Sequence, residues 1–344
     1  MHVSNGRCPH RWVLAAACLL AATAGQAWAG DFSFGGKVFA DFSSQQQNDH
    51  VAQTSNRDWN GDLKRLYLDA DYAFDSNWSM HLTTDVNWLR DQSVTDVWVR
   101  HLYVQRKFAG GTTLRIGVND MPMMSLTSKW YGYRYVDPIG SSMAKIDSSA
   151  DWGVHLNAQA GANVDVAVAV VSGGGYKQPR TGDRADVEAV VAWHPDPRAV
   201  IAVGGYDGQL AAEGTAARPL YHTARRADFM AAWTDDTWRF GARYAYGSNW
   251  ANLYTVDSER TRNVSVWASR QLTSKWSVFT RFDTTWPRLL HDSSRKNRYA
   301  NAGVEYRPRK GIRLALVGKH TTQHRQDNLL RSGNEIGIWS EWLF

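Results

Sequence analysis

The sequence has 344 residues, with 39 Lys and Arg, 33 Asp and Glu, and a net charge of +6. This charge is too small for a nucleic-acid-binding surface, so we predict no nucleic-acid partner. The chain carries 17 Trp and 14 Tyr, yet its mean hydropathy is -0.46. Both cysteines, Cys8 and Cys18, lie near the N-terminus, which excludes a disulfide scaffold for the rest of the chain.

The first 29 residues have the order of features found in secretory signal peptides. Arg7 and Arg11 precede an apolar run, and the run is followed by a small-residue cleavage pattern at Ala27-Trp28-Ala29. The apolar run is shorter than the roughly 20 residues that span a bilayer, which disfavours a membrane anchor. A lipoprotein beginning at Cys18 is an alternative with a poorly placed lipobox. We predict a cleaved signal over 1–29 and one domain over 30–344, with a net charge of +4.

Two stretches of the chain alternate strictly between apolar and polar side chains. Their apolar positions run from Trp78 to Trp88 and from Trp276 to Trp286, and mostly polar residues lie between them. A transmembrane barrel strand alternates in this way, with apolar side chains toward lipid and polar ones toward the lumen. Ten tilted residues rise roughly 23 Å, close to the apolar band of about 25 Å that aromatic girdles flank. We therefore predict an all-β, transmembrane antiparallel β-barrel.

The same alternation extends along the chain and predicts about 16 strands. Short connections, expected to be periplasmic turns, alternate with longer external loops. The predicted strands are 31–43, 62–74, 77–89, 96–108, 112–119, 151–160, 163–172, 184–194, 199–207, 224–234, 236–247, 262–272, 274–286, 297–307, 311–320 and 333–344.

Three basic residues do not fit this alternation. Arg100, Arg106 and Arg270 fall on faces that are otherwise apolar. Either the strand register slips at these positions, or the side chains snorkel from the strand ends toward water.

One connection, 120–150, is much longer than a usual loop. Its aromatic residues indicate that it packs against other parts of the protein, so we expect it to fold into the lumen rather than extend outside. The same side chains are candidates for stacking on sugar rings, but packing is the simpler interpretation. These residues are Trp130, Tyr131, Tyr133 and Tyr135.

This layout resembles the Gram-negative outer-membrane porins, with a long third external loop and a last strand that ends at Phe344. Four stretches, 62–68, 77–79, 83–86 and 131–135, are similar to the phosphate-selective O/P-type porin group. The resemblance implies a homotrimer among outer-membrane lipids, with the third loop as the constriction. It also implies passive diffusion of small hydrophilic solutes and ions through a water-filled channel. In such proteins the barrel assembly machinery recognises the C-terminal strand.

The predicted lumen face carries more acidic than basic side chains. This balance does not support the ladder of basic residues that phosphate selectivity requires, and many charges are expected to pair across strands. Opposed charges at a constriction would orient solutes and set ion preference. The predicted pore-lining residues are Asp120, Lys129, Arg134, Asp137 and Lys145 near or within the long loop, and Arg65, Asp85, Arg115, Arg239, Arg243, Arg281, Asp283 and Arg313 on the wall.

The last strand ends the chain on alternating apolar residues. We expect it to pair with the first strand, since a barrel in a membrane leaves no edge unpaired. Its terminal aromatic residues are predicted to join the interfacial girdles. The predicted girdle residues are Trp78, Trp88, Trp276, Trp286, Trp342 and Phe344.

The sequence contains no G-x-S-x-G, H-E-x-x-H or P-loop motif, and we predict no enzyme activity, metal or cofactor. A barrel enzyme remains an alternative, with His81 beside Ser79 or His155 beside Asp151 as the nearest candidates. A substrate-selective anion or carbohydrate channel and a plugged adhesion barrel are others. A diffusion channel is favoured, because a barrel of about 16 strands leaves an aqueous lumen.

Overall fold

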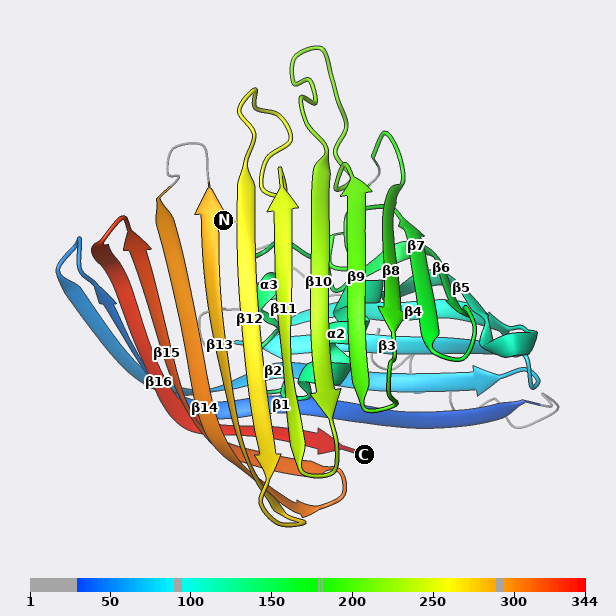
Figure 1. The fold of residues 1–344 in the computed structure, drawn as a ribbon, viewed down its shortest axis with the longest axis horizontal. Helices are drawn as coiled ribbons and strands as arrows, with labels where there is room; N and C mark the ends of the chain where they lie inside the picture. The colour runs from blue at the N-terminus through cyan, green and yellow to red at the C-terminus, as the bar shows by residue number, and fades with distance from the viewer. Residues whose placement is uncertain (1–29, 90–94, 179, 181, 289–293) are drawn as a thin grey trace, which may run out of the picture.

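The computed structural model describes residues 30–344 except 90–94, 179, 181 and 289–293, so the predicted signal peptide over 1–29 lies outside it. Sixteen antiparallel strands form one closed barrel, in which each strand pairs with its sequence neighbours and β1 pairs with β16. The predicted fold and strand number are confirmed. In Figure 1, strands β9–β13 stand upright in front and β1–β4 run nearly horizontally behind them.

The bounds of β3–β14 lie within two residues of the predicted ranges, and β1, β2, β15 and β16 are longer than predicted. The strands are β1 Asp31–Asp49, β2 Thr54–Ala73, β3 Trp78–Trp88, β4 Asp96–Lys107, β5 Thr113–Asp120, β6 Ala150–Gln159, β7 Val164–Val171, β8 Asp186–Trp193, β9 Ala199–Gly208, β10 Ala224–Thr234, β11 Trp238–Ser248, β12 Arg260–Gln271, β13 Trp276–Arg288, β14 Arg295–Arg309, β15 Ile312–Arg325 and β16 Asn328–Leu343. The helices are η1 Ala109–Gly111, α2 Pro122–Tyr131 and α3 Gly140–Met143. No helix in the described ranges is long and apolar enough to cross a membrane.

The two ends of the barrel differ in their connections. One end, here called the turn end, carries short turns such as 74–77 and 235–237 together with the C-terminus. The opposite end, the loop end, carries the longer connections, among them 121–149, 172–185 and 209–223.

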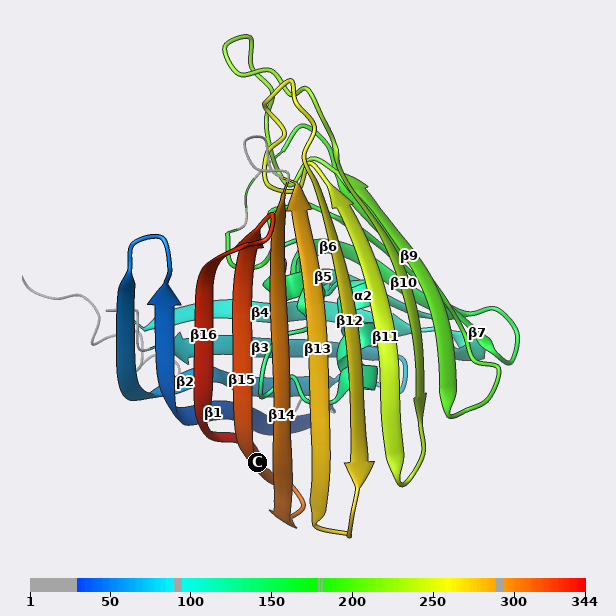
Figure 2. The ribbon, with the colours of Figure 1, turned by 60° about the vertical axis from the view of Figure 1, so that its left-hand side comes forward.

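Two connections predicted to be long loops are instead tight hairpins between extended strands, so this part of the prediction was wrong. β1 continues to Asp49 before β2 begins at Thr54, and β15 continues to Arg325 before β16 begins at Asn328. Figure 2 shows the β1–β2 hairpin standing upright at the left edge, beside β16. The extended segments are mostly polar on both faces, with Trp59, Leu329 and Leu330 as exceptions, so the regular alternation that marks a membrane strand is missing there even though the hydrogen-bonded ladder continues.

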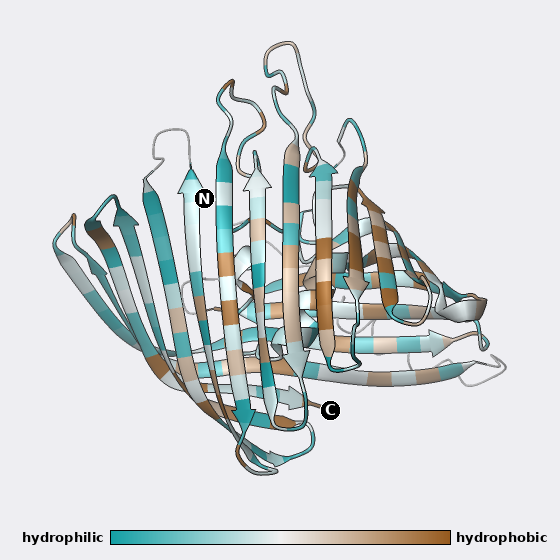
Figure 3. Ribbon diagram, viewed as in Figure 1, coloured by the Kyte–Doolittle hydropathy of each residue, from teal (hydrophilic) through white to brown (hydrophobic). Residues whose placement is uncertain are grey.

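The predicted girdle residues lie on the outer surface near the strand ends. Trp88 is 62% exposed at the loop end, and Phe344 is 63% exposed at the turn end. The others are also exposed or half-buried at one of the two ends; they are Trp78, Trp276, Trp286 and Trp342. Figure 3 shows hydrophobic segments in the middle of β12 and hydrophilic residues toward its loop end.

The three basic residues that do not fit the alternation have two different explanations. The pairing of β3 with β4 shifts register between Thr83 and Thr84, and this irregularity turns Arg100 into the lumen, where it is 4% exposed. Arg106 and Arg270 instead point outward at the turn end. Their guanidinium carbons lie 5.1 Å and 5.0 Å from the ring centres of Trp78 and Trp238 respectively. These two side chains therefore snorkel along interfacial tryptophans.

The chain closes on itself where β16 meets β1, as the sequence predicts. The backbone N–H of Gly36 donates to the carbonyl of Phe344 at 2.9 Å, and the N–H of Phe344 donates to the carbonyl of Gly36 at 3.2 Å. A Cβ on Gly36 would lie 2.4 Å from the Phe344 ring and 2.7 Å from the Tyr67 carbonyl oxygen. The terminal aromatic residue thus packs directly over a position that has no room for a side chain.

We expect Gly36→Val to destabilise the barrel by about 1 to 3 kcal/mol, because the new side chain overpacks the seam. The measurement is the free energy of unfolding in detergent or vesicles. The matched control is Gly318→Ala, since a Cβ at Gly318 meets no atom within 4 Å. Equal stability of the two variants would contradict the packing described at the seam.

Candidate functional site

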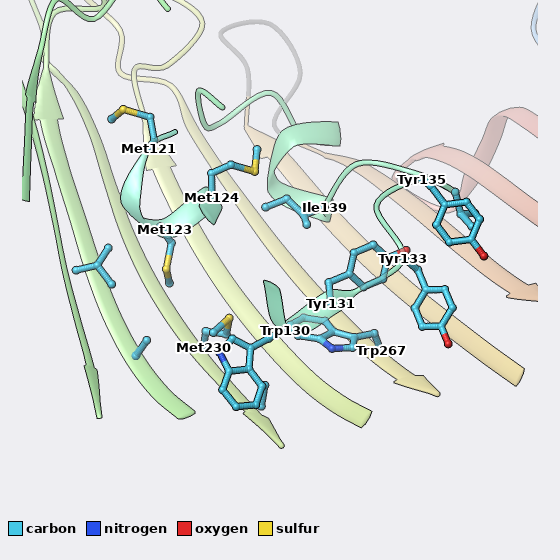
Figure 4. Close-up of a cluster of buried hydrophobic side chains, with 14 of the residues drawn as sticks. Met121, Met123, Met124, Trp130, Tyr131, Tyr133, Tyr135, Ile139, Met230 and Trp267 are labelled. Atoms are coloured by element: carbon cyan, nitrogen blue, oxygen red, sulfur yellow. The ribbon is translucent and has the colours of Figure 1, made fainter. Parts of the chain in front are cut away.

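The third loop-end connection, residues 121–149 and here called L3, folds into the lumen. Its helix α2 packs against the inner faces of β7, β8, β10 and β11, and α3 packs against β12. Figure 4 shows the methionine and aromatic side chains of L3 gathered beside Met230 and Trp267 of the wall. The predicted inward course of this loop is confirmed.

The four aromatic residues of L3 are buried against the wall. The Tyr133 ring stacks on Phe279 with centroids 4.2 Å apart, and the Tyr131 ring meets Trp267 edge-on at 6.0 Å. The Tyr135 hydroxyl donates to Glu305 Oε2 at 2.7 Å. Figure 4 shows these rings directed toward the strands. Their faces are occupied by protein, which supports the packing interpretation rather than stacking on sugar rings.

A row of four buried charges crosses the wall beneath L3. Arg226 donates to Glu188 Oε2 at 2.5 Å and to Asp228 Oδ2 at 2.6 Å, and Arg243 donates to Asp228 Oδ1 at 2.6 Å. We call Glu188, Arg226, Asp228 and Arg243 the charge chain. Its side chains are at most 2% exposed, so each charge depends on its neighbour for compensation.

The charge chain holds L3 at both ends of the loop. Near the start, the backbone N–H of Met123 donates to Glu188 Oε1 at 2.8 Å. Near the finish, Arg243 donates to Ser141 Oγ at 2.6 Å and lies 3.6 Å from Asp147. L3 is therefore attached to the wall through bonds that strengthen one another in a low-dielectric setting.

The middle of L3 is held by two more cations. Arg281 donates to the Pro138 carbonyl at 2.7 Å and pairs with Asp283 at 2.9 Å, while Lys319 pairs with Asp137 at 2.8 Å. Burial would raise the pKa of the Asp137 carboxyl, but Lys319 and other nearby cations outweigh this effect and hold the pKa below its usual value. L3 and the wall thus neutralise each other's charges along this stretch.

These contacts correct part of the predicted pore lining. L3 covers Arg243 and Arg281, which are each 2% exposed, so both anchor the loop instead of facing solute. Asp283 is paired with Arg281 and is also buried, although it contributes to the lining of a cavity.

Two predicted pore-lining arginines, on β11 and β15, border the turn-end side of L3. Arg313 pairs with Glu305 at 2.6 Å and with Glu341 at 3.0 Å. Arg239 lies under Gly132, where an added Cβ would be 1.5 Å from its Nη1 atom. Glycine at this position, with φ of 78°, allows L3 to turn directly over the arginine.

L3 borders two cavities that lie toward opposite ends of the barrel. A cavity of about 690 Å³ on the loop-end side is lined by Asp137 and Gly140 of L3 and by polar residues of β1 and β13–β16. A cavity of about 340 Å³ on the turn-end side is lined by Ser125 and Lys129 of α2 and by Arg115, Asp120 and Asp165 of the wall. Different parts of L3 therefore line the two spaces, residues 137–144 the first and α2 the second.

The wall of β2–β6 opposite L3 carries mixed charges. Arg65 pairs with Asp85 at 2.9 Å, and Arg100 pairs with Asp120, whose carboxylate also contacts His101 at 3.1 Å. The Asp85 carboxylate accepts a second bond from the Tyr176 hydroxyl at 2.6 Å. Each of these carboxylates is thus already matched by a cation.

Three cations in this region have no such match. Arg115 donates to the Gln105 amide oxygen at 2.8 Å, and Arg134 donates to Ser128 Oγ at 3.1 Å. Lys129 is exposed on α2. Within the described ranges, no carboxylate lies within ion-pair distance of these three side chains, which leaves local positive charge. Lys145 is also exposed, at the end of L3 after α3.

Two inward-facing cations, Lys64 and Arg226, were not predicted from the sequence, and a third, Arg100, was predicted only as a misfit to the alternation. Lys64 pairs with Asp41 at 2.9 Å, because the register shift between Leu63 and Leu66 turns it and the next residue inward. Arg100 is inward for a similar reason, and its misfit to the alternation is the signal from which a register slip was one of the two predicted explanations. The inward position of Arg226 could have been predicted, since residues two apart in a strand share a face and Asp228 was placed on the lumen face.

The candidate enzyme residues do not form catalytic pairs. His81 contacts Asp71 at 2.6 Å and Thr83 at 2.7 Å instead of Ser79. His155 lies 3.3 Å from the backbone carbonyl of Asp151, not from its carboxylate. Among the described residues, no group of three or more His, Cys, Asp or Glu side chains is arranged to hold a metal ion.

Solved structures of outer-membrane porins and channels have the same architecture as this chain. The fold is that of the outer-membrane porins. The chain is similar to the anion-selective porin from Comamonas acidovorans, with a TM-score of 0.68, 10% identity, and coverage of 92% of this chain and 100% of that one. It is also similar to the outer-membrane channel DcaP of Acinetobacter baumannii, with a TM-score of 0.66, 12% identity, and coverage of 92% and 97%.

A third similar structure is Salmonella typhi OmpF in complex with daunomycin, with a TM-score of 0.59, 12% identity, and coverage of 91% and 97%. No family model and no curated protein sequence matches the chain. At these identities the likeness carries the fold, and the chemistry of the pore rests on the residues described above.

Proposed function

We propose that this protein is an outer-membrane porin, a water-filled channel for passive diffusion of small hydrophilic solutes and ions. The observation that carries this proposal is L3, which is bonded inside a closed barrel between two cavities. A barrel of 16 strands encloses an aqueous lumen unless a plug fills it, and cavities of about 690 Å³ and 340 Å³ remain beside L3. The proposal includes removal of residues 1–29, location in the outer membrane of a Gram-negative bacterium, and no enzyme activity or cofactor.

The proposed constriction lies between L3 and the wall of β2–β6. Arg115, Lys129 and Arg134 supply positive charge there, and the carboxylates of Asp85 and Asp120 are matched by arginines. Rings of side chains of one sign set the ion preference of a pore. The channel therefore prefers small anions. Similarity to the phosphate-selective O/P-type porins stays a prediction.

The proposed assembly is a homotrimer embedded in outer-membrane lipids. This part rests on the sequence resemblance and on the porin fold. Phe344, exposed at the turn end of the seam, is the proposed contact for the barrel assembly machinery.

Purified, folded protein in a planar lipid bilayer tests the proposed function. We expect stepwise increases in conductance, and a reversal potential of the sign for anion preference under a salt gradient. Heat-modifiable, folded protein that gives no conductance steps would refute the diffusion channel. Steps with cation preference would refute the proposed role of the three unmatched cations.

A further inference from the structure

The outer surface at the loop end carries a basic cluster on β12–β14. The guanidinium carbon of Arg262 lies 5.8 Å from the ring centre of Trp286, and the Lys296 ammonium lies 5.7 Å from the same ring. Arg298 follows on the same face of β14, beside Thr284 in the strand register. We call Arg262, Lys296 and Arg298 the basic patch.

The strand register places these side chains side by side. Arg262 of β12 is directly opposite Trp286 of β13, and Thr284, two residues further along the outer face, is opposite Arg298 of β14. Thr284 is 6% exposed although it points outward, which shows how closely its neighbours cover it. The next row toward the rim continues the charge, since Arg260 is opposite Arg288.

The basic patch has no acidic partner in the described part of the chain. None of its three members forms an ion pair there, and no Asp or Glu occupies an outward position of β12, β13 or β14. Another outward arginine, Arg225 of β10, is paired with Asp207 at 2.9 Å. Cations without carboxylates on a crowded surface repel one another, so this arrangement is complementary to an anion from outside the chain.

The position of the patch in the membrane defines the anion. Trp286 and Trp276 mark the two ends of the outward face of β13, about the thickness of the apolar band apart. The patch surrounds Trp286 at the loop end, at the depth of the lipid headgroups. In Figure 3, β12 and β14 become hydrophilic at this level. A lipid phosphate lies at this depth, and arginine binds phosphate through parallel hydrogen bonds.

We infer that the basic patch is a binding site for the phosphate groups of an anionic lipid in the outer leaflet. Arg262 and Arg298 bind phosphate oxygens, Lys296 supplies further charge, and the Trp286 ring packs against the lipid beside its headgroup. At the turn end, Arg106 and Arg270 each lie over a tryptophan of their own instead of sharing one ring. The basic patch lies at the loop-end depth, so the inferred site belongs to one leaflet. This inference rests on the proposed insertion in an outer membrane.

Native mass spectrometry of the folded protein in neutral detergent tests this site, with bis-phosphorylated lipid A as the probe. We expect the wild type to retain this lipid and not its dephosphorylated form. The triple variant R262Q/K296Q/R298Q should bind the phosphorylated lipid about tenfold more weakly or worse, since each basic residue near a membrane surface contributes to anionic-lipid binding. Millimolar inorganic phosphate should not displace the lipid, because the acyl chains also hold it.

The matched control is R106Q/R270Q, which removes cations from tryptophans at the turn end and should leave lipid A binding unchanged. Equal binding of phosphorylated and dephosphorylated lipid by the wild type would overturn the proposal without any variant. Unchanged binding by the triple variant would also overturn it, as would an equal loss in the control. Planar-bilayer conductance of the same preparations distinguishes the two proposals: if the triple variant conducts normally but loses the lipid, the channel and the lipid site are separate properties.

Discussion

Replacing Arg226 by Met is expected to lower the free energy of unfolding by about 3 to 5 kcal/mol, because it leaves buried carboxylates without their shared cation. Arg226 bonds to Glu188, to Asp228 and to the Ile146 carbonyl of L3, the last at 3.3 Å. The loss therefore combines wall stability with attachment of the loop. The measurement is denaturant unfolding of the barrel in lipid vesicles.

The neighbouring residue provides the control. Arg225 points outward with a side chain that is 68% exposed and pairs with Asp207, so Arg225→Gln should cost about 0 to 1 kcal/mol. A double variant, Arg226→Met with Glu188→Gln, should recover part of the loss, because it removes one of the uncompensated charges. Equal stabilities of Arg225→Gln and Arg226→Met would contradict the account of the charge chain.

Replacing Lys129 and Arg134 together by Glu is expected to change the channel from anion preference to cation preference. Each substitution replaces one positive charge by one negative charge, on L3 where the proposed constriction is narrowest. Ion preference follows the charge of such side chains, because they act on ions at close range inside the pore. The measurement is the reversal potential under a salt gradient in a planar bilayer.

The control makes the same change in net charge away from L3. Lys275→Glu with Arg309→Glu alters exposed residues beside turns at the turn end, and it should change the reversal potential only slightly. An unchanged reversal potential in the L3 variant would show that α2 and the following turn do not border the narrowest point. An equal effect in both variants would indicate that net charge, and not position, sets the preference.

The sequence predicts most of the fold because membrane strands must alternate. The stretch from Trp276 to Trp286 reproduces β13 nearly residue by residue, and the closing of the last strand on the first follows from the requirement for paired edges. The prediction fails where this constraint ends. The extensions of β1, β2, β15 and β16 beyond the apolar band carry mostly polar side chains on both faces, so they show no regular alternation from which a strand could be predicted.

The candidate site was less predictable, because it depends on local register and on the path of one loop. Each shift of a single residue turns a side chain to the opposite face, and such shifts bring Lys64 and Arg100 inward. The alternation correctly places Arg281 on the lumen face of its strand. Only the course of L3 shows that its guanidinium donates to the Pro138 carbonyl and is not exposed to solute. Alternation fixes which face a residue occupies, and long-range packing decides what covers it.

If L3 borders the conducting path, a bulky group attached to a thiol introduced on α2 will obstruct it. Residues 30–344 contain no cysteine, and Ser125 is exposed on α2 and lines the cavity shared with Arg115 and Lys129. Val266→Cys, on the outward face of β12, is the control. We predict that a bulky, charged thiol reagent lowers the conductance of Ser125→Cys in discrete steps and leaves Val266→Cys unchanged. Complete labelling of Ser125→Cys without a change in conductance would contradict the account.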